Sequence, residues 1–182
     1  QLSVSIEPTD LGIILTKSVE DLQNQAKQKN ITLVLLSATS LPKVLADPIR
    51  VSEVVNNLVA NAINYTNPGG QIMVSSQILD REVITTVSDT GIGIPQSVIP
   101  HLFNKFFRVS NHLQEASKGT GLGLYISRSI IQKLNGRIWV ESEVNKGSQF
   151  RFSLPVAAQI NLSSLDSNKF INQTIQSGGL NY

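Results

Sequence analysis

The sequence of 182 residues contains no cysteine, which excludes a disulfide framework and any metal site built from thiolates. Aromatic residues make up only 5% and charged residues only 15% of the chain, whereas hydrophobic residues reach 41%. This composition excludes the intrinsically disordered class for most of the length. No apolar run approaches the roughly 18 residues that a membrane span needs, and no signal peptide opens the sequence. We therefore expect a globular domain of ordinary size.

Strong charge of either sign is also missing. The formal net charge is only +2, and lysine and arginine form no dense run. A nucleic-acid partner is therefore not expected. The absence of cysteine fits a reducing compartment. The chain begins in strand-like sequence, as a piece of a longer protein would.

Hydrophobic periodicity predicts helices interleaved with strands. Three helices are expected, over residues 10–29, 48–65 and 121–134. Thr9 is the candidate cap of the first helix, and Asp47 with Pro48 suits the start of the second. Strands are expected over residues 2–6, 31–36 (a buried strand), 71–79, 82–88, 137–143 and 148–154. These elements predict an α+β fold, a two-layer sandwich with helices on one face of a mixed, mostly antiparallel sheet.

Two stretches lack such periodicity. Residues 93–119 form a long irregular connection, which in a compact domain is usually functional. Residues 156–182 are rich in asparagine, glutamine and serine and are interpreted as a polar tail or linker. The domain itself is expected to cover residues 1–155.

The second expected helix carries the first of three motifs. Glu53, Asn57 and Asn61 are spaced by four residues, so they share one side of the helix, opposite its apolar stripe. A carboxamide oxygen is a neutral, hard ligand for Mg²⁺, which keeps several waters and shares its shell with phosphates. Asn57 and Asn61 are therefore candidate Mg²⁺ ligands. A single asparagine on a polar helix face is more often plain solvated surface.

The second motif is an acidic turn. Asp89 follows an expected strand and precedes Gly91 and Gly93. A carboxylate at a strand end can accept a hydrogen bond from the exocyclic amine of adenine, whereas guanine presents an acceptor there. Glycines allow the backbone to pass close to a flat ring. Taken alone, a simple Asp-Thr-Gly turn would be the commoner interpretation.

The third motif, residues 119–124 (GTGLGL), opens a helix and offers free amides to an anion. It lacks a preceding strand and a Walker lysine, so it is neither a dinucleotide fingerprint nor a P-loop. Its place after the irregular segment fits a lid over phosphates. Within that segment, residues 102–108 (LFNKFFR) offer aromatic anchors, with Lys105 and Arg108 as candidate phosphate contacts. A short amphipathic helix that fills the core is the equally weighted alternative.

Together these motifs resemble the ATP-binding catalytic domain of bacterial sensor histidine kinases, members of the wider GHKL ATPase group. The boxes of that family resemble residues 57–66 (NLVANAINYT, N box), 89–95 (DTGIGIP, G1), 102–108 (LFNKFFR, F) and 119–124 (GTGLGL, G2). Residues 146–150 resemble the closing hairpin. The likeness covers about residues 1–155, and four boxes in the family order are a highly specific signal.

The resemblance implies a Bergerat ATP-binding fold, with ATP and Mg²⁺ under a flexible lid. The implied site comprises Asn57, Asn61, Tyr65, Asp89, Gly91, Gly93, Lys105, Arg108, Gly119, Thr120, Gly121, Leu122 and Gly123. By the resemblance, Asp89 takes the adenine amine, Tyr65 lies against the base, and Asn57 and Asn61 hold Mg²⁺. The family often has lysine where this chain has Asn64, so Lys105, Arg108 or Lys118 would take over that phosphate contact.

The implied activity is that of a protein-histidine kinase, which moves the γ-phosphate of ATP to a histidine on a dimerisation domain absent from this chain. His101 and His112 lack the family's histidine-box surroundings, so no phosphoacceptor is expected within the chain. The implied partners are an acceptor domain in the same or the partner protomer and a response regulator, reached through the full-length kinase. The parent is expected to be a homodimer and this fragment a monomer. The expected location is the cytoplasm, including the cytoplasmic part of a membrane-bound sensor.

Other functions remain open on the sequence. ATP-hydrolysing relatives of the gyrase and Hsp90 type carry a glutamate, as base for water, four residues before the metal-binding asparagine. This chain has Asn57 there, and a carboxamide cannot act as a base at neutral pH. A non-catalytic binding module and a serine kinase of the anti-sigma type are the remaining alternatives.

Overall fold

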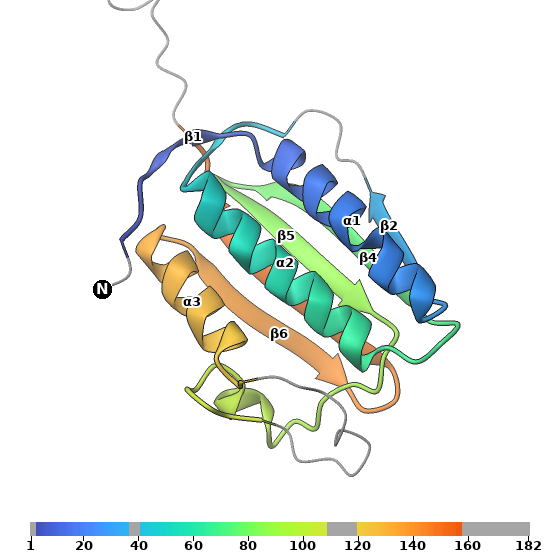
Figure 1. Cartoon of the computed structure of the whole chain (residues 1–182). Coiled ribbons are helices and arrows are strands. Elements are labelled where there is room, and N and C mark those ends of the chain that lie inside the picture. Colours follow the sequence, from blue (N-terminus) through green and yellow to red (C-terminus); the bar gives the residue numbers. More distant parts are fainter. Residues whose placement is uncertain (1–2, 37–40, 109–119, 158–182) are drawn as a thin grey trace, which may run out of the picture.

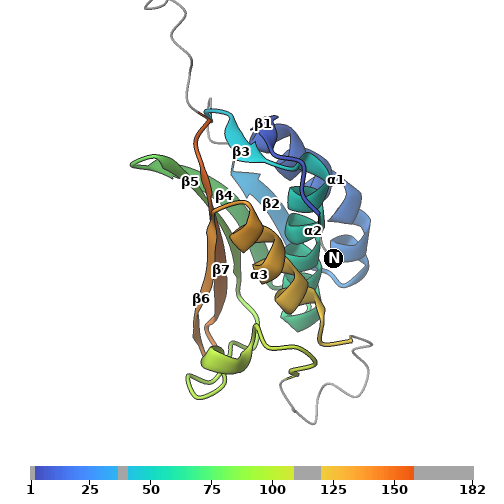
Figure 2. The same cartoon turned by 90° about the vertical axis from the view of Figure 1, so that its left-hand side faces the viewer.

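The computed structural model describes residues 3–36, 41–108 and 120–157. Within these ranges, three α-helices cover one face of a five-stranded sheet (Figure 1). The side view of Figure 2 separates the two layers, with the sheet on one side and the helices on the other. The predicted two-layer α+β sandwich is confirmed. No helix in the described ranges is long and apolar enough to cross a membrane.

The sheet has the strand order β2-β4-β5-β7-β6. Its strands are β2 (Thr32–Leu36), β4 (Gln71–Leu79), β5 (Glu82–Asp89), β6 (Arg137–Glu143) and β7 (Gly147–Pro155). Only β2 and β4 run parallel, so the sheet is mixed and mostly antiparallel, as predicted. The interpretation of β2 as a buried strand was wrong. It lies at the sheet edge, where Leu33 is buried but Val34 is 42% exposed, because helices cover one face only.

The helices are α1 (Leu11–Gln28), α2 (Pro48–Tyr65) and α3 (Gly123–Lys133). All three were expected from periodicity, but the cap of α1 was assigned wrongly. Asp10 caps α1 by accepting a hydrogen bond from the Ile13 amide at 3.3 Å. The Thr9 hydroxyl instead donates to the Ala46 carbonyl at 2.9 Å. The tertiary contact with Ala46 therefore takes the hydroxyl that was predicted to cap α1.

The strand expected over residues 2–6 was also wrong, because the described residues 3–6 contain no strand. The first strand is β1 (Glu7–Thr9), which pairs antiparallel with β3 (Val44–Ala46) in a small separate sheet. Strand β3 was not predicted, since three residues are too few to show a period. This pairing holds the N-terminal segment beside the start of α2.

The core lies between the sheet and the helices. On α2 it takes the whole predicted apolar stripe, including Val54, Val55 and Leu58, each at most 1% exposed. The sheet contributes Phe152 and Leu154 from β7, both fully buried. Burying one such side chain contributes about 1.5–3 kcal/mol. The apolar side of α2 is therefore closely packed in the core, which fixes the position of the polar side.

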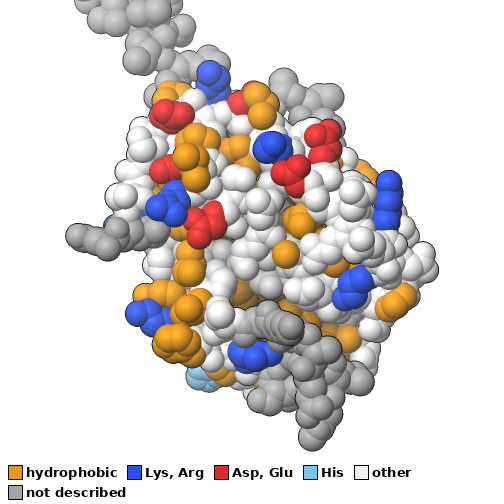
Figure 3. All heavy atoms as spheres, viewed as in Figure 1, with side chains coloured by type: hydrophobic (Ala, Val, Ile, Leu, Met, Phe, Trp, Pro, Cys, Tyr) orange, Lys and Arg blue, Asp and Glu red, His pale blue; other side chains and the backbone are white. Residues whose placement is uncertain are grey.

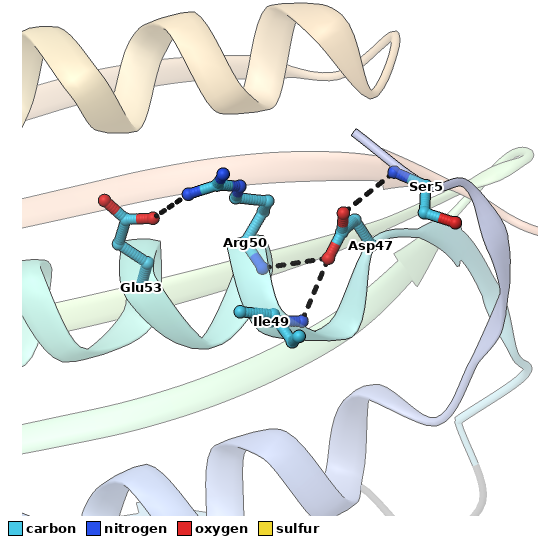
Figure 4. Close-up of polar contacts among 5 residues, drawn as sticks. All are labelled: Ser5, Asp47, Ile49, Arg50 and Glu53. Carbon is cyan, nitrogen blue, oxygen red and sulfur yellow. Dashed lines mark hydrogen bonds and ion pairs between the residues drawn. The ribbon is translucent and has the colours of Figure 1, made fainter. Parts of the chain in front are cut away.

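A network of hydrogen bonds around Asp47 fixes the start of α2 (Figure 4). One carboxylate oxygen accepts from the Ile49 and Arg50 amides at 3.1 Å each, and the other accepts from the Ser5 amide at 2.8 Å. Arg50 also pairs with Glu53 at 3.0 Å. Burial acts to raise the pKa of Asp47. The three amide donors and the Arg50 charge outweigh burial and hold this pKa below its usual 3.8.

The Asp47→Ala variant is expected to lose about 2 kcal/mol of unfolding free energy at pH 7, because three amides lose their acceptor. Since the folded-state pKa is lowered, this contribution is present above pH 3.8 and is lost as the pH falls through the folded value. In urea denaturation, the difference in unfolding free energy between the variant and wild type should therefore be smaller at pH 3 than at pH 7. Asp10→Ala, which removes one exposed capping bond, is the control and should cost less. Equal losses for both variants would contradict this account.

Candidate nucleotide-binding site

A pocket of about 440 Å³ lies at the end of the sandwich where α2 and β5 finish. In Figure 1 this is the lower end, where the described residues 93–108 and the start of α3 lie near the end of α2. The volume falls in the range of small-molecule sites. The lining residues are Asn57, Ala60, Asn61, Ala62, Asn64, Tyr65, Asp89, Ile92, Gly93, Ile94, Leu102, Phe107, Arg108, Thr120, Gly121, Gly123, Leu124, Ser148 and Phe150.

Asp89, the last residue of β5, is a buried carboxylate in this pocket, with 7% of its surface exposed. Its Oδ1 accepts a hydrogen bond from the Gly91 amide at 2.8 Å, and the Ser148 backbone also donates to the carboxylate. Burial raises the pKa of Asp89 above 3.8, and these two bonds offset only part of the shift. A carboxylate has about four acceptor positions. Asp89 can therefore accept a further donor from a ligand.

The two glycines after Asp89 have different positions. Gly93 lines the pocket, as a residue beside the base would. Gly91 does not line it, because it packs against the backbone of α2's last residue. A Cβ on Gly91 would lie 2.3 Å from the Tyr65 carbonyl oxygen. Gly91 therefore allows two backbone segments to pack closely, and the Gly91 amide donates a hydrogen bond to the Asp89 carboxylate.

The polar side of α2 forms one wall. Asn57, Asn61 and Tyr65 follow one another at one helical turn, and all three line the pocket. The Asn57 Nδ2 group donates to the Ser127 hydroxyl of α3 at 2.9 Å. Glu53, on the same side of α2, is paired with Arg50 and does not line the pocket. This wall therefore presents two carboxamides and an aromatic ring to the pocket, and the Glu53 carboxylate is not part of it.

The segment of residues 102–108 contains no α-helix, so the helix of the alternative interpretation was wrong. Its core-filling part is confirmed, since Leu102 is buried in the core and Phe103 and Phe107 pack against it. Leu102, Phe107 and Arg108 line the pocket. Lys105 does not: its Nζ lies 4.9 Å from the centre of the Tyr125 ring, a cation–π contact with α3. Of the two predicted phosphate-contacting cations, only Arg108 lines the pocket in this structure.

The glycine-rich turn closes the pocket on the α3 side. Thr120, Gly121 and Gly123 line the pocket, whereas Leu122 does not. Gly119, together with His112 and Lys118, lies outside the described residues. Because α3 begins at Gly123, its first amides and the positive end of its dipole lie at the pocket. This arrangement suits an anionic ligand.

The distribution of charge also favours an anion. In the view of Figure 3, acidic side chains gather on the upper part of the helical face. On the described surface visible at the pocket end of this face, Lys and Arg side chains are present and acidic ones are not. On this face, basic side chains without acidic neighbours would attract an anion to the pocket end.

Strand β7 also contributes to the pocket, which was not predicted. Ser148 and Phe150 line the pocket because β7 pairs with β5, in a register that places Ser148 opposite Asp89 and Phe150 opposite Val87. Local periodicity cannot reveal a pairing between distant strands. The resemblance of residues 146–150 to the family's closing hairpin was the signal that could have found them.

The donor set fits Mg²⁺ better than a metal held by protein ligands alone. Within the described ranges, no group of three or more His, Cys, Asp or Glu side chains could hold a metal. Asn57 and Asn61 instead offer two neutral amide oxygens on one wall of the pocket. Mg²⁺ commonly takes few protein ligands and completes its shell with water and phosphate oxygens.

The fold and the pocket define a nucleotide-binding domain built as an α/β sandwich. Residues 46–158 match the model of the histidine kinase-, DNA gyrase B- and HSP90-like ATPase family, and the chain belongs to this family. Within it, the chain corresponds to the ATP-binding catalytic domain of histidine kinases. The solved structures that it resembles include one named as the catalytic domain of a histidine kinase.

The catalytic domain of the histidine kinase ThkA, in a nucleotide-free form, matches with a TM-score of 0.74 at 29% identity, over 84% of this chain and 97% of that one. Full-length ShkA in complex with AMPPNP matches with a TM-score of 0.75 at 26% identity, over 87% of this chain and 33% of that one. The adaptive-response sensory kinase SasA of Synechococcus elongatus is 36% identical over 85% of this chain. The chain spans 40% of the length of that relative.

Proposed function

We propose that this chain binds Mg-ATP and delivers its γ-phosphate to a histidine on a separate dimerisation domain, as part of a two-component sensor kinase. The observation that carries the proposal is the chemistry of the pocket lining. Among the described lining residues, Asp89 is the only carboxylate and no histidine is present. The site can hold a nucleotide, but it offers neither an acceptor nor a base of its own.

The adenine end is assigned to Asp89. Its buried carboxylate would accept the exocyclic amine, with Gly93 beside the base and the half-exposed Tyr65 ring against it. Apolar lining residues of the same end, among them Ile92 and Phe150, would cover the ring faces. A hydrogen bond to a buried charged acceptor discriminates strongly between bases.

The phosphate end is assigned to α2 and to the start of α3. Asn57 and Asn61 would hold Mg²⁺, which when bound would neutralise charge on the phosphates. Arg108, Thr120 and the first amides of α3 would position the phosphate oxygens. The Lys105 side chain would need to leave the Tyr125 ring before it contacted a phosphate.

The pocket favours phosphate transfer over hydrolysis. Related hydrolases activate water with a glutamate, and Asn57 occupies that position here. Glu53 is engaged by Arg50 one turn further back, and Asp89 is at the adenine end. Without a base beside the γ-phosphate, water remains a poor nucleophile. The nucleophile must therefore come from another domain.

The expected partners follow because the nucleotide site and the phosphoacceptor lie in separate domains. The acceptor histidine belongs to the same or the partner protomer of a homodimeric parent, and a response regulator receives the phosphate from it. The solved complex of ThkA with the response regulator TrrA, 27% identical to this chain with a TM-score of 0.69, supports that kind of partner. We expect the isolated chain to be a monomer and to work in the cytoplasm, where ATP is available.

The test is a transfer assay. The chain, γ-labelled Mg-ATP and the dimerisation domain of the full-length kinase are mixed, and the acceptor should gain acid-labile phosphate. An Asn61→Ala chain, which lacks one proposed Mg²⁺ ligand, should label the acceptor at least about tenfold more slowly. Steady ATP turnover by the chain alone, with no label on the acceptor, would instead identify a hydrolase.

A further inference from the structure

The two ends of an asparagine side chain are opposite in function. The carboxamide oxygen binds cations, whereas the NH₂ group is a donor and repels them. Asn57 lines the phosphate end of the pocket, so its usefulness there depends on which end faces the ligand. The residues that hold the carboxamide therefore decide what Asn57 can do.

The nitrogen of this carboxamide is held by a buried hydroxyl. Asn57 Nδ2 donates to the Ser127 Oγ atom at 2.9 Å, and Ser127 is 2% exposed. Ser127 lies in the middle of α3, on the side that packs against α2, and its helical neighbours Ile130 and Ile131 are fully buried. An apolar side chain would satisfy packing at such a position. Ser127 instead carries a hydroxyl, and this hydroxyl has a specific polar partner in the Asn57 carboxamide.

The oxygen of the same carboxamide points the other way along α3. A Cβ placed on Gly123 would lie 2.3 Å from Asn57 Oδ1, closer than from Nδ2 at 3.2 Å. Gly123 precedes Ser127 by one helical turn and lines the pocket. The carboxamide therefore lies along α3, with its nitrogen on the Ser127 side and its oxygen at the pocket end of the helix.

We infer that Ser127 is a positioning residue, which fixes the Asn57 carboxamide with its oxygen toward the Mg²⁺ and phosphate end of the pocket. The inference rests on the proposed function, since it concerns the orientation of a ligand for Mg-ATP. It also links two motifs physically, because Ser127 belongs to the helix that the glycine-rich turn opens. Groups that orient a metal ligand commonly change metal affinity about 10–100-fold when they are removed.

The test is the Ser127→Ala variant, with dissociation constants for ATP measured by calorimetry in Mg²⁺ and in EDTA. We expect the affinity in Mg²⁺ to fall about tenfold, because the freed carboxamide can turn its NH₂ group to the cation. The affinity in EDTA should hardly change. Ser127→Thr, which keeps a hydroxyl, should recover the Mg²⁺ dependence.

Ser129→Ala is the matched control on the same helix. The Ser129 hydroxyl donates to the Tyr125 carbonyl at 2.9 Å and does not reach Asn57. This variant should leave both affinities near wild type. In a double-mutant cycle, Asn57→Ala and Ser127→Ala together should lose little more than Asn57→Ala alone.

The outcomes separate this inference from the function on which it rests. A wild-type chain with no measurable affinity for Mg-ATP would overturn both. A wild-type chain that binds Mg-ATP, with a Ser127→Ala variant whose affinity falls equally in Mg²⁺ and EDTA or in neither, would overturn the positioning role alone. A loss confined to Mg²⁺ that Ser127→Thr reverses supports it.

Discussion

Replacing Asp89 with asparagine is expected to weaken ATP binding about 100-fold while the chain stays folded. On the proposed assignment, the variant would lose the hydrogen bond from the adenine amine to a buried charged acceptor, and its own NH₂ group would face that amine. A bond of this kind contributes about 1.5–3 kcal/mol, and each 1.4 kcal/mol corresponds to a factor of about ten in affinity. Calorimetry with ATP in Mg²⁺ measures the loss.

The same change should not lower the unfolding free energy of the chain, although it weakens ATP binding. Burial raises the pKa of Asp89, so the ionised carboxylate is less favourable in the folded chain than in the unfolded chain. The resulting cost is absent well below pH 3.8, grows as the pH rises toward the folded value, and is fully present at neutral pH. Without nucleotide, the asparagine variant should therefore unfold at pH 7 with a free energy equal to or above that of wild type.

Asp80→Asn provides a matched control. Asp80 lies in the turn before β5, at the opposite end from Asp89, with a φ of 55° that asparagine adopts readily. The same chemical change there should leave ATP affinity near wild type. Unchanged affinity in the Asp89 variant, or equal losses in both, would refute the assignment of Asp89 to adenine.

Replacing Gly147 with alanine should be the most destabilising single change at the site, with a loss of about 3–5 kcal/mol of unfolding free energy. Gly147 opens β7 with a φ of 102°, and a Cβ there would lie 1.9 Å from the Asp89 carbonyl oxygen. The strand cannot retreat without losing its pairing with β5. ATP affinity should therefore fall together with stability, as urea denaturation and calorimetry would record.

Gly69→Ala separates the two causes of this effect. Gly69 also has a positive φ, 87°, but a Cβ added to it would meet no other atom within 4 Å. Backbone strain alone should cost about 1–2 kcal/mol there. The remainder of the Gly147 loss measures the clash with β5. If the two variants lost the same stability, strain rather than close approach would explain Gly147.

Local chemistry explains which parts of the fold were predictable. Asp47 and Pro48 marked the start of α2, because a carboxylate cap and a first-turn proline act within a few residues. The same rules placed the α1 cap one residue early, since the Thr9 hydroxyl is taken by Ala46 from a distant segment. Short pairings such as β1 with β3 arise from tertiary contacts that local patterns do not contain.

The residues of the candidate site also differ in whether local sequence patterns could predict them. Asn57 and Asn61 were predictable as one wall, because helical spacing puts them on one side of α2, and the family resemblance added Tyr65. Lys105 and Ser148 were not. Charge and sequence position cannot decide between a phosphate and the Tyr125 ring as the partner of Lys105, and the place of Ser148 depends on strand register.

The pairing of β5 with β7 has a consequence for the order of events during synthesis. Asp89 and its neighbour across the sheet, Ser148, are far apart in the chain, and β7 is the last strand of the sheet to be made. Contacts of such long sequence separation form slowly and late in folding. A nascent chain that has released only β2 to β6 therefore lacks the strand that places Ser148 and Phe150 in the pocket beside Asp89. On the proposed function, the chain would therefore bind nucleotide only after β7 has paired with β5, and bound ATP would stabilise that pairing.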